Sequence, residues 1–247
     1  MPTARSLATA LLIVAAAGAA WLAALETPVF SVRTIEVSGA PVGVGTQVKG
    51  ALATTEGTSL LKVDLGAALR NVEALPTVAS ARFDRAFPHT LRVVVVPERA
   101  VAVVRQGARS YVVAESGRLM AASDRHARPA LARIWVKRDV QLDVGASADG
   151  DLLTAISAVA PLVGSGFPGR VSSVTVTPTN LALTLRSGLE IRLGDPQDVA
   201  LKLAVAARVI PLLTSDTTYL DVAVPERPVS GTLNSQVEVK SSTSTQP

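Results

Sequence analysis

A helix and a β-hairpin are encoded within residues 64–97, DLGAALRNVEALPTVASARFDRAFPHTLRVVVVP. Apolar residues recur at spacings of three and four over 65–75, which predicts an amphipathic helix. Its apolar stripe comprises Leu65, Ala68, Leu69, Val72 and Leu75. Asp64 is placed to cap this helix, because its carboxylate can accept hydrogen bonds from the first free N–H groups. Pro76 then ends it.

Two strands are predicted after this helix, over 78–84 and 90–96, with a turn at 85–89 between them. In the second strand the apolar residues of one face are Leu91, Val93 and Val95. Ahead of the helix, residues 30–37 are rich in Val and Ile and predict another strand, and 45–53 predict a short helix. The order strand, helix, helix, strand, strand describes a small α+β unit.

A mostly β region with two helices is predicted beyond residue 98. One helix covers 151–163, and the other opens at Asp195-Pro196-Gln197-Asp198, where a capping carboxylate, a proline and a second acidic residue mark a helix start. The predicted strands, separated by Gly-containing or polar turns, cover 101–104, 110–113, 118–121, 134–136, 171–176, 181–185 and 189–193. The tail 233–247 is rich in Ser and Thr and is expected to be disordered.

An uncharged stretch at 6–25 predicts one membrane-spanning helix. Most of it would form a helix roughly 28 Å long, close to the ~30 Å hydrocarbon core of a bilayer. Arg5 precedes the stretch and Glu26 closes it, so the positive-inside rule keeps the start in the cytoplasm and exports the rest. Residues 1–26 are therefore expected to be a short cytoplasmic start and a transmembrane helix. The alternative is a cleaved signal peptide, because 17–19 reads Ala-Gly-Ala.

Composition excludes several classes of function. The net charge is +4, but the basic residues are scattered and only 3% of residues are aromatic. A nucleic-acid-binding surface needs clustered Lys and Arg with stacking aromatic residues. The chain has no cysteine, which excludes disulfides, thiol catalysis and cysteine-bound metal.

The sequence offers no catalytic constellation, so we expect neither an enzyme nor a cofactor or metal site. Its histidines, His89 and His126, lie in predicted loops, whereas a metal site needs three or four convergent ligands. Residues 164–169 match the dinucleotide-binding pattern G-x-G-x-x-G, but they follow a helix and precede a strand, the reverse of the required order. We interpret them as a loop. A loose basic cluster, interpreted as a solvated loop, comprises Arg125, Arg128 and Arg133.

Several segments, taken in order, resemble the bacterial cell-division family FtsQ/DivIB. Those that resemble its POTRA domain and the exit from it read FSVRTIEVSG at 30–39, LPTVASA at 75–81, RAFPHTLRV at 85–93 and VPERAVA at 96–102. Those that resemble its C-terminal β domain are SGLEIRLG at 187–194, Lys202, and YLDVAVP at 219–225. The family usually has Pro in place of Ala100 and often Trp in place of Phe87, and both positions stay apolar here.

The resemblance implies a POTRA domain at 27–97 and a β domain at 98–232. Members of this family are single-pass inner-membrane scaffolds of the division septum. They bind FtsB (or DivIC) and FtsL, and through them the septal peptidoglycan synthase. Relatives commonly carry a longer cytoplasmic arm, so either this protein lacks the arm or its start codon was assigned too late. The alternative function is a secreted or anchored POTRA protein of an export or envelope-assembly pathway.

The segment 219–224, together with the residues up to Ser230, is the predicted docking surface. Apolar and polar residues alternate there, so one face could lie on the core while a free sheet edge pairs with an extended partner segment. The resemblance implies that FtsB or DivIC docks here by adding a strand. Motif position carries this role to Tyr219, Asp221, Val222, Ala223, Val224, Arg227, Val229 and Ser230. Motif position also places Glu98 and Arg99 at the junction of the two domains, where this charged pair could fix the relative orientation of the domains.

Overall fold

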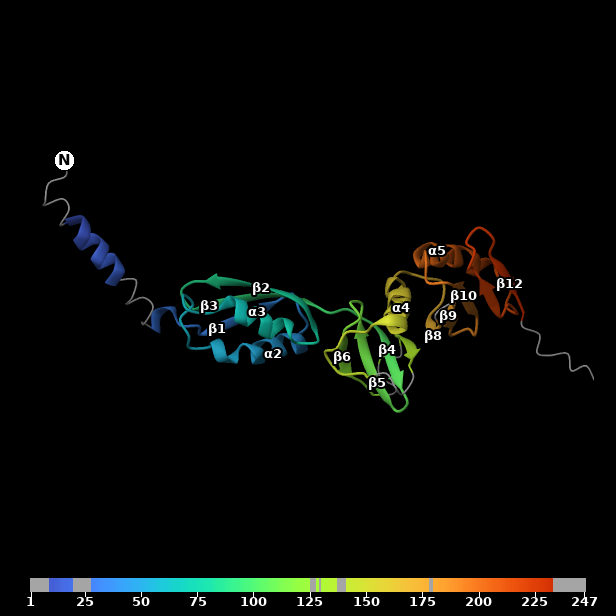
Figure 1. Ribbon diagram of the computed structural model, residues 1–247, viewed down its shortest axis with the longest axis horizontal. Helices are drawn as coiled ribbons and strands as arrows, with labels where there is room; N and C mark the ends of the chain where they lie inside the picture. The colour runs from blue at the N-terminus through green and yellow to red at the C-terminus, as the bar shows by residue number, and fades with distance from the viewer. Residues whose placement is uncertain are drawn as a thin grey trace, which may run out of the picture. The chain divides into compact units, whose positions relative to one another are not determined.

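The computed structural model describes residues 9–19, 28–124, 128, 130–136, 141–177 and 180–232. The chain divides into two compact units, Met1–Arg99 (unit 1) and Ala100–Pro247 (unit 2). Each unit combines helices with a β-sheet (Figure 1), which confirms the predicted α+β class. The predicted disordered tail lies outside the described residues.

The predicted membrane-spanning segment is described only in part. Residues 9–19 form a helix whose side chains are exposed, among them Leu11 and Leu12, which are 75% and 70% exposed. The other residues of 6–25 lie outside the described ranges. Of the helices within those ranges, none is both long enough and apolar enough to cross a membrane.

Unit 1 packs two helices on one face of a three-stranded sheet (Figure 1). Its elements are, in order, the 3-10 helix η1 (Pro28–Phe30), β1 (Thr34–Ser38), α2 (Val42–Ala51), the 3-10 helix η2 (Ala53–Thr55), α3 (Leu65–Glu73), β2 (Val78–Ala86) and β3 (Thr90–Pro97). The central strand, β3, runs parallel to β1 and antiparallel to β2. The predicted order of elements is confirmed. The predicted start of the first strand at residue 30 is wrong, because η1 occupies that position.

The helix α3 carries the predicted cap and most of the predicted stripe. Asp64 accepts a hydrogen bond from the Ala67 amide at 3.0 Å through its Oδ1. Ala68 and Val72 are buried against the sheet, where Leu91 and its alternate neighbours complete the core. Leu69 is only half-buried and is not among the residues packed in this core. The stripe is therefore narrower than the sequence predicts.

Unit 2 is built on a nine-stranded sheet with the order β12-β11-β10-β9-β8-β7-β4-β5-β6. The strands are β4 (Ala100–Gln106), β5 (Arg109–Ala114), β6 (Leu119–Ala122), β7 (Ala132–Trp135), β8 (Val171–Thr177), β9 (Asn180–Leu185), β10 (Glu190–Gly194), β11 (Tyr219–Asp221) and β12 (Val229–Gly231). The helices are α4 (Gly150–Val159) and α5 (Val199–Val209), each followed by a 3-10 turn, η3 (Ala160–Leu162) and η4 (Ile210–Leu212). Buried residues of both helices and of the sheet share one core, as Ile156, Leu203 and Ile191 illustrate.

The start of α5 differs from its prediction. Asp198, at a φ of 50°, is the residue before the helix, and Asp195 lies upstream of it as the partner of a lysine rather than as a cap. Lys202, whose side chain is 4% exposed, donates to the Asp195 carboxylate and, at 2.9 Å, to the Asp195 carbonyl. The hydrogen bond from Lys202 lowers the pKa of the Asp195 carboxyl. This pair ties the end of β10 to the first turn of α5.

Candidate partner-binding site

The predicted docking strand at 219–224 is not a sheet edge. Its strand portion, β11, pairs with β10 on one side and with β12 on the other. Beyond it, the Val222 amide donates to the Arg192 carbonyl at 2.9 Å, and the Ala223 amide donates to Asp221 Oδ1 at 2.9 Å. These donors are already engaged within unit 2, so the prediction that 219–224 itself lies at a sheet edge is wrong.

Of the predicted docking residues, Val222 is turned inward and Ala223 is half-buried. Val222 is fully buried in the core of unit 2. Ala223 packs on the backbone of Gly194, where an added Cβ would lie 2.7 Å from the Ala223 Cβ. The remaining predicted residues are half-buried or exposed: Tyr219, Asp221, Val224, Arg227, Val229 and Ser230.

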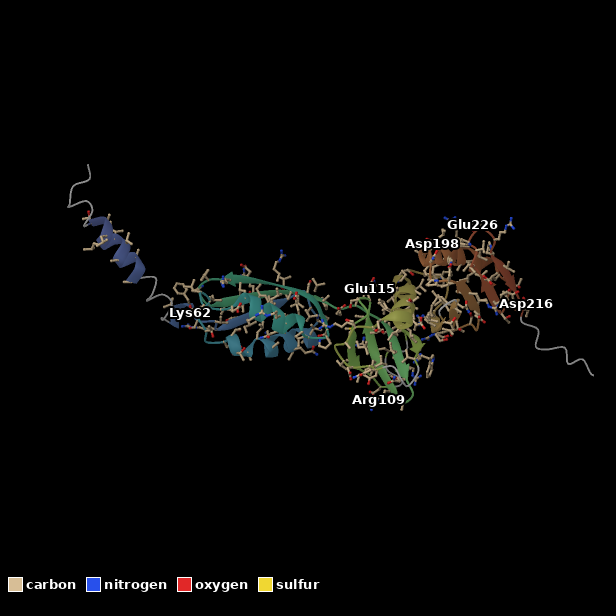
Figure 2. The ribbon with its side chains drawn as sticks, viewed as in Figure 1. Lys62, Arg109, Glu115, Asp198, Asp216 and Glu226 are labelled. Atoms are coloured by element: carbon tan, nitrogen blue, oxygen red, sulfur yellow. The ribbon has the colours of Figure 1, made fainter. Side chains whose placement is uncertain are left out.

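A tight turn after β11 brings the chain back as β12. The Arg227 amide donates to the Val224 carbonyl at 3.0 Å, and the exposed Glu226 lies within this turn (Figure 2). Pro225 lies within the turn and Pro228 follows it, and proline favours turns because its φ is fixed and it lacks an N–H. This Pro-Glu-Arg-Pro sequence was the signal from which a turn, and therefore a strand returning beside β11, could have been predicted. The strand that follows is three residues long, too short to be detected by alternation.

Of the described strands, β12 is the one at this end of the sheet, next to β11. Which way its backbone groups face follows from the bonds between β10 and β11. The Glu190 amide donates to the Thr218 carbonyl at 2.9 Å, and the Val222 amide donates to the Arg192 carbonyl at 2.9 Å. Leu220, midway between them, therefore directs its own backbone groups toward β10.

The backbone groups of neighbouring residues in a strand point to opposite sides, so Tyr219 and Asp221 face β12. Their partners in the register are Gly231 and Val229, respectively. Ser230 lies between these partners and opposite Leu220, and its N–H and C=O groups are consequently directed away from β11. This places one donor and one acceptor on the outer side of β12, at a residue whose side chain is exposed.

A charged network lies beside this edge. The Arg192 guanidinium lies 4.6 Å from the centroid of the Tyr219 ring, and its Nε donates to Glu190 Oε1 at 3.1 Å. The hydrogen bond to Glu190 raises the pKa of Arg192, and the charge of Asp221 adds to this effect. The network holds the Tyr219 ring against the sheet through a cation–π contact.

The predicted junction residues, Glu98 and Arg99, connect β3 to β4. The Glu98 amide donates to the Thr77 carbonyl at 2.9 Å, which fixes the chain where it leaves unit 1. Their role in setting the orientation of the units stays a prediction.

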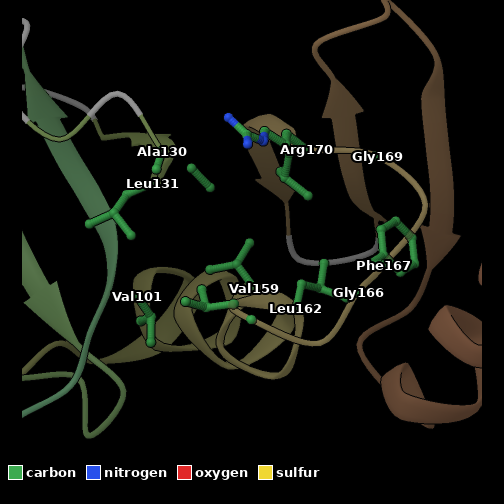
Figure 3. Close-up of a pocket in the computed structure, with 13 residues that line it drawn as sticks. Val101, Ala130, Leu131, Val159, Leu162, Gly166, Phe167, Gly169 and Arg170 are labelled. Carbon is green, nitrogen blue, oxygen red and sulfur yellow. The ribbon is translucent and has the colours of Figure 1, made fainter.

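Residues 164–169 form a loop, as predicted. It connects η3 to β8 and lines a cavity of about 370 Å³ (Figure 3). The lining is mostly apolar and includes Leu162 of η3 and Phe167 of the loop, and Arg170 contributes a charged side chain. Within the described ranges, no group of three His, Asp or Glu side chains could hold a metal ion.

The histidines and the loose basic cluster noted in the sequence are dispersed or have structural roles. The His89 carbonyl accepts hydrogen bonds from the Arg33 and Thr34 amides, which fastens the β2–β3 turn to β1. Of the loose basic cluster, Arg133 lies in β7 and Arg128 has a φ of 53°. Arg125 and His126 lie outside the described residues.

Two domain families match the chain in the same order as its units. The family described as "POTRA domain, FtsQ-type" matches residues 30–99. The family described as "Cell division protein FtsQ/DivIB, C-terminal" matches residues 102–223, so its match ends before β12 begins.

Curated relatives are similar over most of the chain. The cell division protein FtsQ of Mycobacteroides abscessus is 30% identical over 82% of this chain and 62% of its own length. That of Mycolicibacterium smegmatis is 31% identical over 82% of this chain and 57% of its own length. That of Mycobacterium tuberculosis is 30% identical over 90% and 67%, respectively. The chain thus spans about three fifths of the length of the first two relatives.

Proposed function

The chain belongs to the FtsQ/DivIB family of bacterial cell-division proteins, and from that premise we propose that it is a single-pass membrane scaffold of the divisome. It acts by binding rather than by catalysis. Its partners are FtsB/DivIC and FtsL type proteins and, indirectly, the septal peptidoglycan synthase. The apolar segment 6–25 anchors it in the inner membrane, and units 1 and 2 lie on the extracytoplasmic side at the division septum.

The observation that carries the docking part of this proposal is the outward-facing backbone of Ser230. A partner strand laid along β12 would accept a hydrogen bond from the Ser230 N–H and donate one to the Ser230 C=O. This is strand addition to a sheet edge. The partner would thereby extend the nine-stranded sheet of unit 2 by one strand.

The side chains around β12 define the surface that a partner strand would contact. Directly paired residues point to the same face of a sheet, so Val229 and Gly231 share a face with Tyr219 and Asp221. Val229 is 55% exposed and offers an apolar contact there. The charged side chains of that face favour a partner strand that carries polar groups beside its apolar ones.

Proline and alanine at position 230 test the docking edge. In Ser230→Pro the outward N–H is lost while the bonds to β11 are kept, because those are made by the neighbouring residues. We expect FtsB-type partner binding to weaken about tenfold or more, since a net hydrogen bond contributes roughly 1 kcal/mol and the ring also obstructs the strand. Ser230→Ala keeps the N–H and should bind like the parent protein.

The measurement is a titration of the full chain with the FtsB-type protein of the same organism. Both variants must keep the thermal unfolding midpoint of the parent. A folded Ser230→Pro protein that binds with unchanged affinity would exclude β12 as the docking edge. Depletion of the protein in cells tests the divisome role separately, because loss of septation should give undivided filaments or chains.

A further inference from the structure

One end of unit 1 gathers three segments that are distant in sequence. The Leu60 amide donates to the Phe30 carbonyl at 2.7 Å, which joins the loop before α3 to η1. The Arg33 amide donates to the His89 carbonyl at 2.9 Å, which joins the chain before β1 to the β2–β3 turn. This end is therefore built around η1, which leads the chain into the sheet and helices of unit 1.

Apolar side chains are exposed at this end. Phe87, at the tip of the β2–β3 turn, is 54% exposed, and Val29 in η1 is 55% exposed. The rings of Phe87 and Phe30 meet edge to face, with centroids 5.9 Å apart and an interplanar angle of 86°. We refer to Val29, Phe30 and Phe87 as the entry patch.

The entry patch is held by the fold and has basic neighbours. Arg85 Nη2 donates to the Val63 carbonyl at 3.0 Å, which ties the base of the β2–β3 turn to the loop before α3. Lys62, in the same loop, is exposed at this end of the unit (Figure 2). An apolar and aromatic surface with a cationic neighbour suits the headgroup layer of a bilayer, where aromatic rings are enriched and anionic lipids attract Lys.

Chain length puts the entry patch beside the proposed membrane anchor. Val29 follows Leu25, the last residue of the apolar segment, by four positions. At no more than about 3.6 Å per residue, those positions reach about 14 Å at most. The headgroup region on each side of the hydrocarbon core is several ångströms thick. A surface tethered this closely cannot leave the neighbourhood of the bilayer.

We propose that the entry patch contacts the headgroup layer of the outer leaflet of the membrane in which the chain is anchored. Phe87 and Val29 lie among the headgroups, and Lys62 faces lipid phosphates. This contact restricts the tilt of unit 1 relative to the membrane. The proposal rests on the anchor at 6–25, which is part of the proposed function.

Tryptophan reporters in the full chain test this contact. The native Trp21 and Trp135 are first replaced by Phe, and single tryptophans are then introduced as Phe87→Trp, Val42→Trp or Leu12→Trp. Each protein is placed in nanodiscs of phosphatidylethanolamine and phosphatidylglycerol, with and without brominated acyl chains. Val42 is the matched control, because it is apolar and 89% exposed but begins α2, after β1 has run away from the entry end.

We expect emission from position 87 to shift to the blue and to be quenched by brominated lipid, with position 42 unquenched. Quenching at position 12 together with unquenched, iodide-accessible emission at position 87 would overturn the contact and leave the anchor intact. Unquenched emission at position 12 would overturn both. Should Phe87→Trp melt earlier than its parent, a bimane label on Lys62→Cys gives the same comparison with Phe87 intact, because the chain has no other cysteine.

Discussion

The Tyr219 ring lies against Gly231 across the ladder between β11 and β12. A Cβ added at Gly231 would lie 2.8 Å from the Tyr219 hydroxyl oxygen and 2.9 Å from its Cε1. Contacts this short are not sustained between real atoms, so a side chain at position 231 would require the Tyr219 ring or the strand to shift. The edge strand and the ring held by Arg192 therefore depend on each other.

Gly231→Ala is expected to loosen β12. The added methyl forces the Tyr219 ring or the strand to move, at a cost of about 1 kcal/mol or more. Hydrogen exchange of the β12 amides should become faster, and FtsB-type partner binding should weaken. In a Tyr219→Ala background the same substitution should have little effect, because the clash is gone. Equal effects in both backgrounds would contradict the proposed dependence.

Val72→Asp is expected to unfold unit 1. Val72 is fully buried, and a carboxylate there loses its hydration without gaining a partner, which should cost about 3 kcal/mol or more. Leu69→Asp, on the half-buried side of the same helix, should cost clearly less. Thermal denaturation of the full chain, followed by a probe in unit 1, compares them. An equal loss for both would contradict the burial difference.

The Asp195–Lys202 pair predicts a defined response to acid. The pKa of the Asp195 carboxyl is lower in the folded state than its ordinary value near 4. Its stabilising contribution is therefore complete above that ordinary value and is lost as the pH falls through the folded pKa. Because Asp195 is 59% exposed, solvent screens part of the effect.

The matched variants are Asp195→Ala and Lys202→Met. Asp195→Ala leaves a buried ammonium without its carboxylate and should lower the unfolding midpoint more than Lys202→Met, which removes the buried charge. Below about pH 4 each variant should lose less stability than the parent, because the contribution of the Asp195 carboxyl to the acid response is gone while that of other carboxyls, such as Asp64, remains. The reverse order of midpoints at neutral pH would argue against the pair as the anchor of α5.

The proposed anchor predicts that residues 1–25 remain on the mature protein and that it fractionates with membranes, because the uncharged stretch can span a bilayer. N-terminal sequencing of the mature chain checks this. A chain that begins just after Ala19 or Ala20 would show that the segment is a cleaved signal peptide.

Sequence reasoning succeeded where one element carries several concordant signals. In α3 the apolar spacing, the capping carboxylate of Asp64 and the stop at Pro76 all agree, and the helix forms at 65–73. It failed at the docking edge, because pairing partners are set by tertiary structure. Nothing local distinguishes a strand paired on both sides, as β11 is, from one at an edge. At Asp195 the cap signal was misleading, because its carboxylate and carbonyl instead accept hydrogen bonds from Lys202 in the first turn of α5.

The brevity of β12 has a consequence for when docking can occur. Three residues provide only a few ladder bonds, and a short edge also resists unwanted pairing with other chains. A contact of this size is weak between molecules that meet by free diffusion. It becomes substantial when both molecules are confined to one surface, because confinement raises their effective concentration without any new contact. In the proposed docking, the length of this strand thus sets the local concentration of partner that is needed before the sheet is extended.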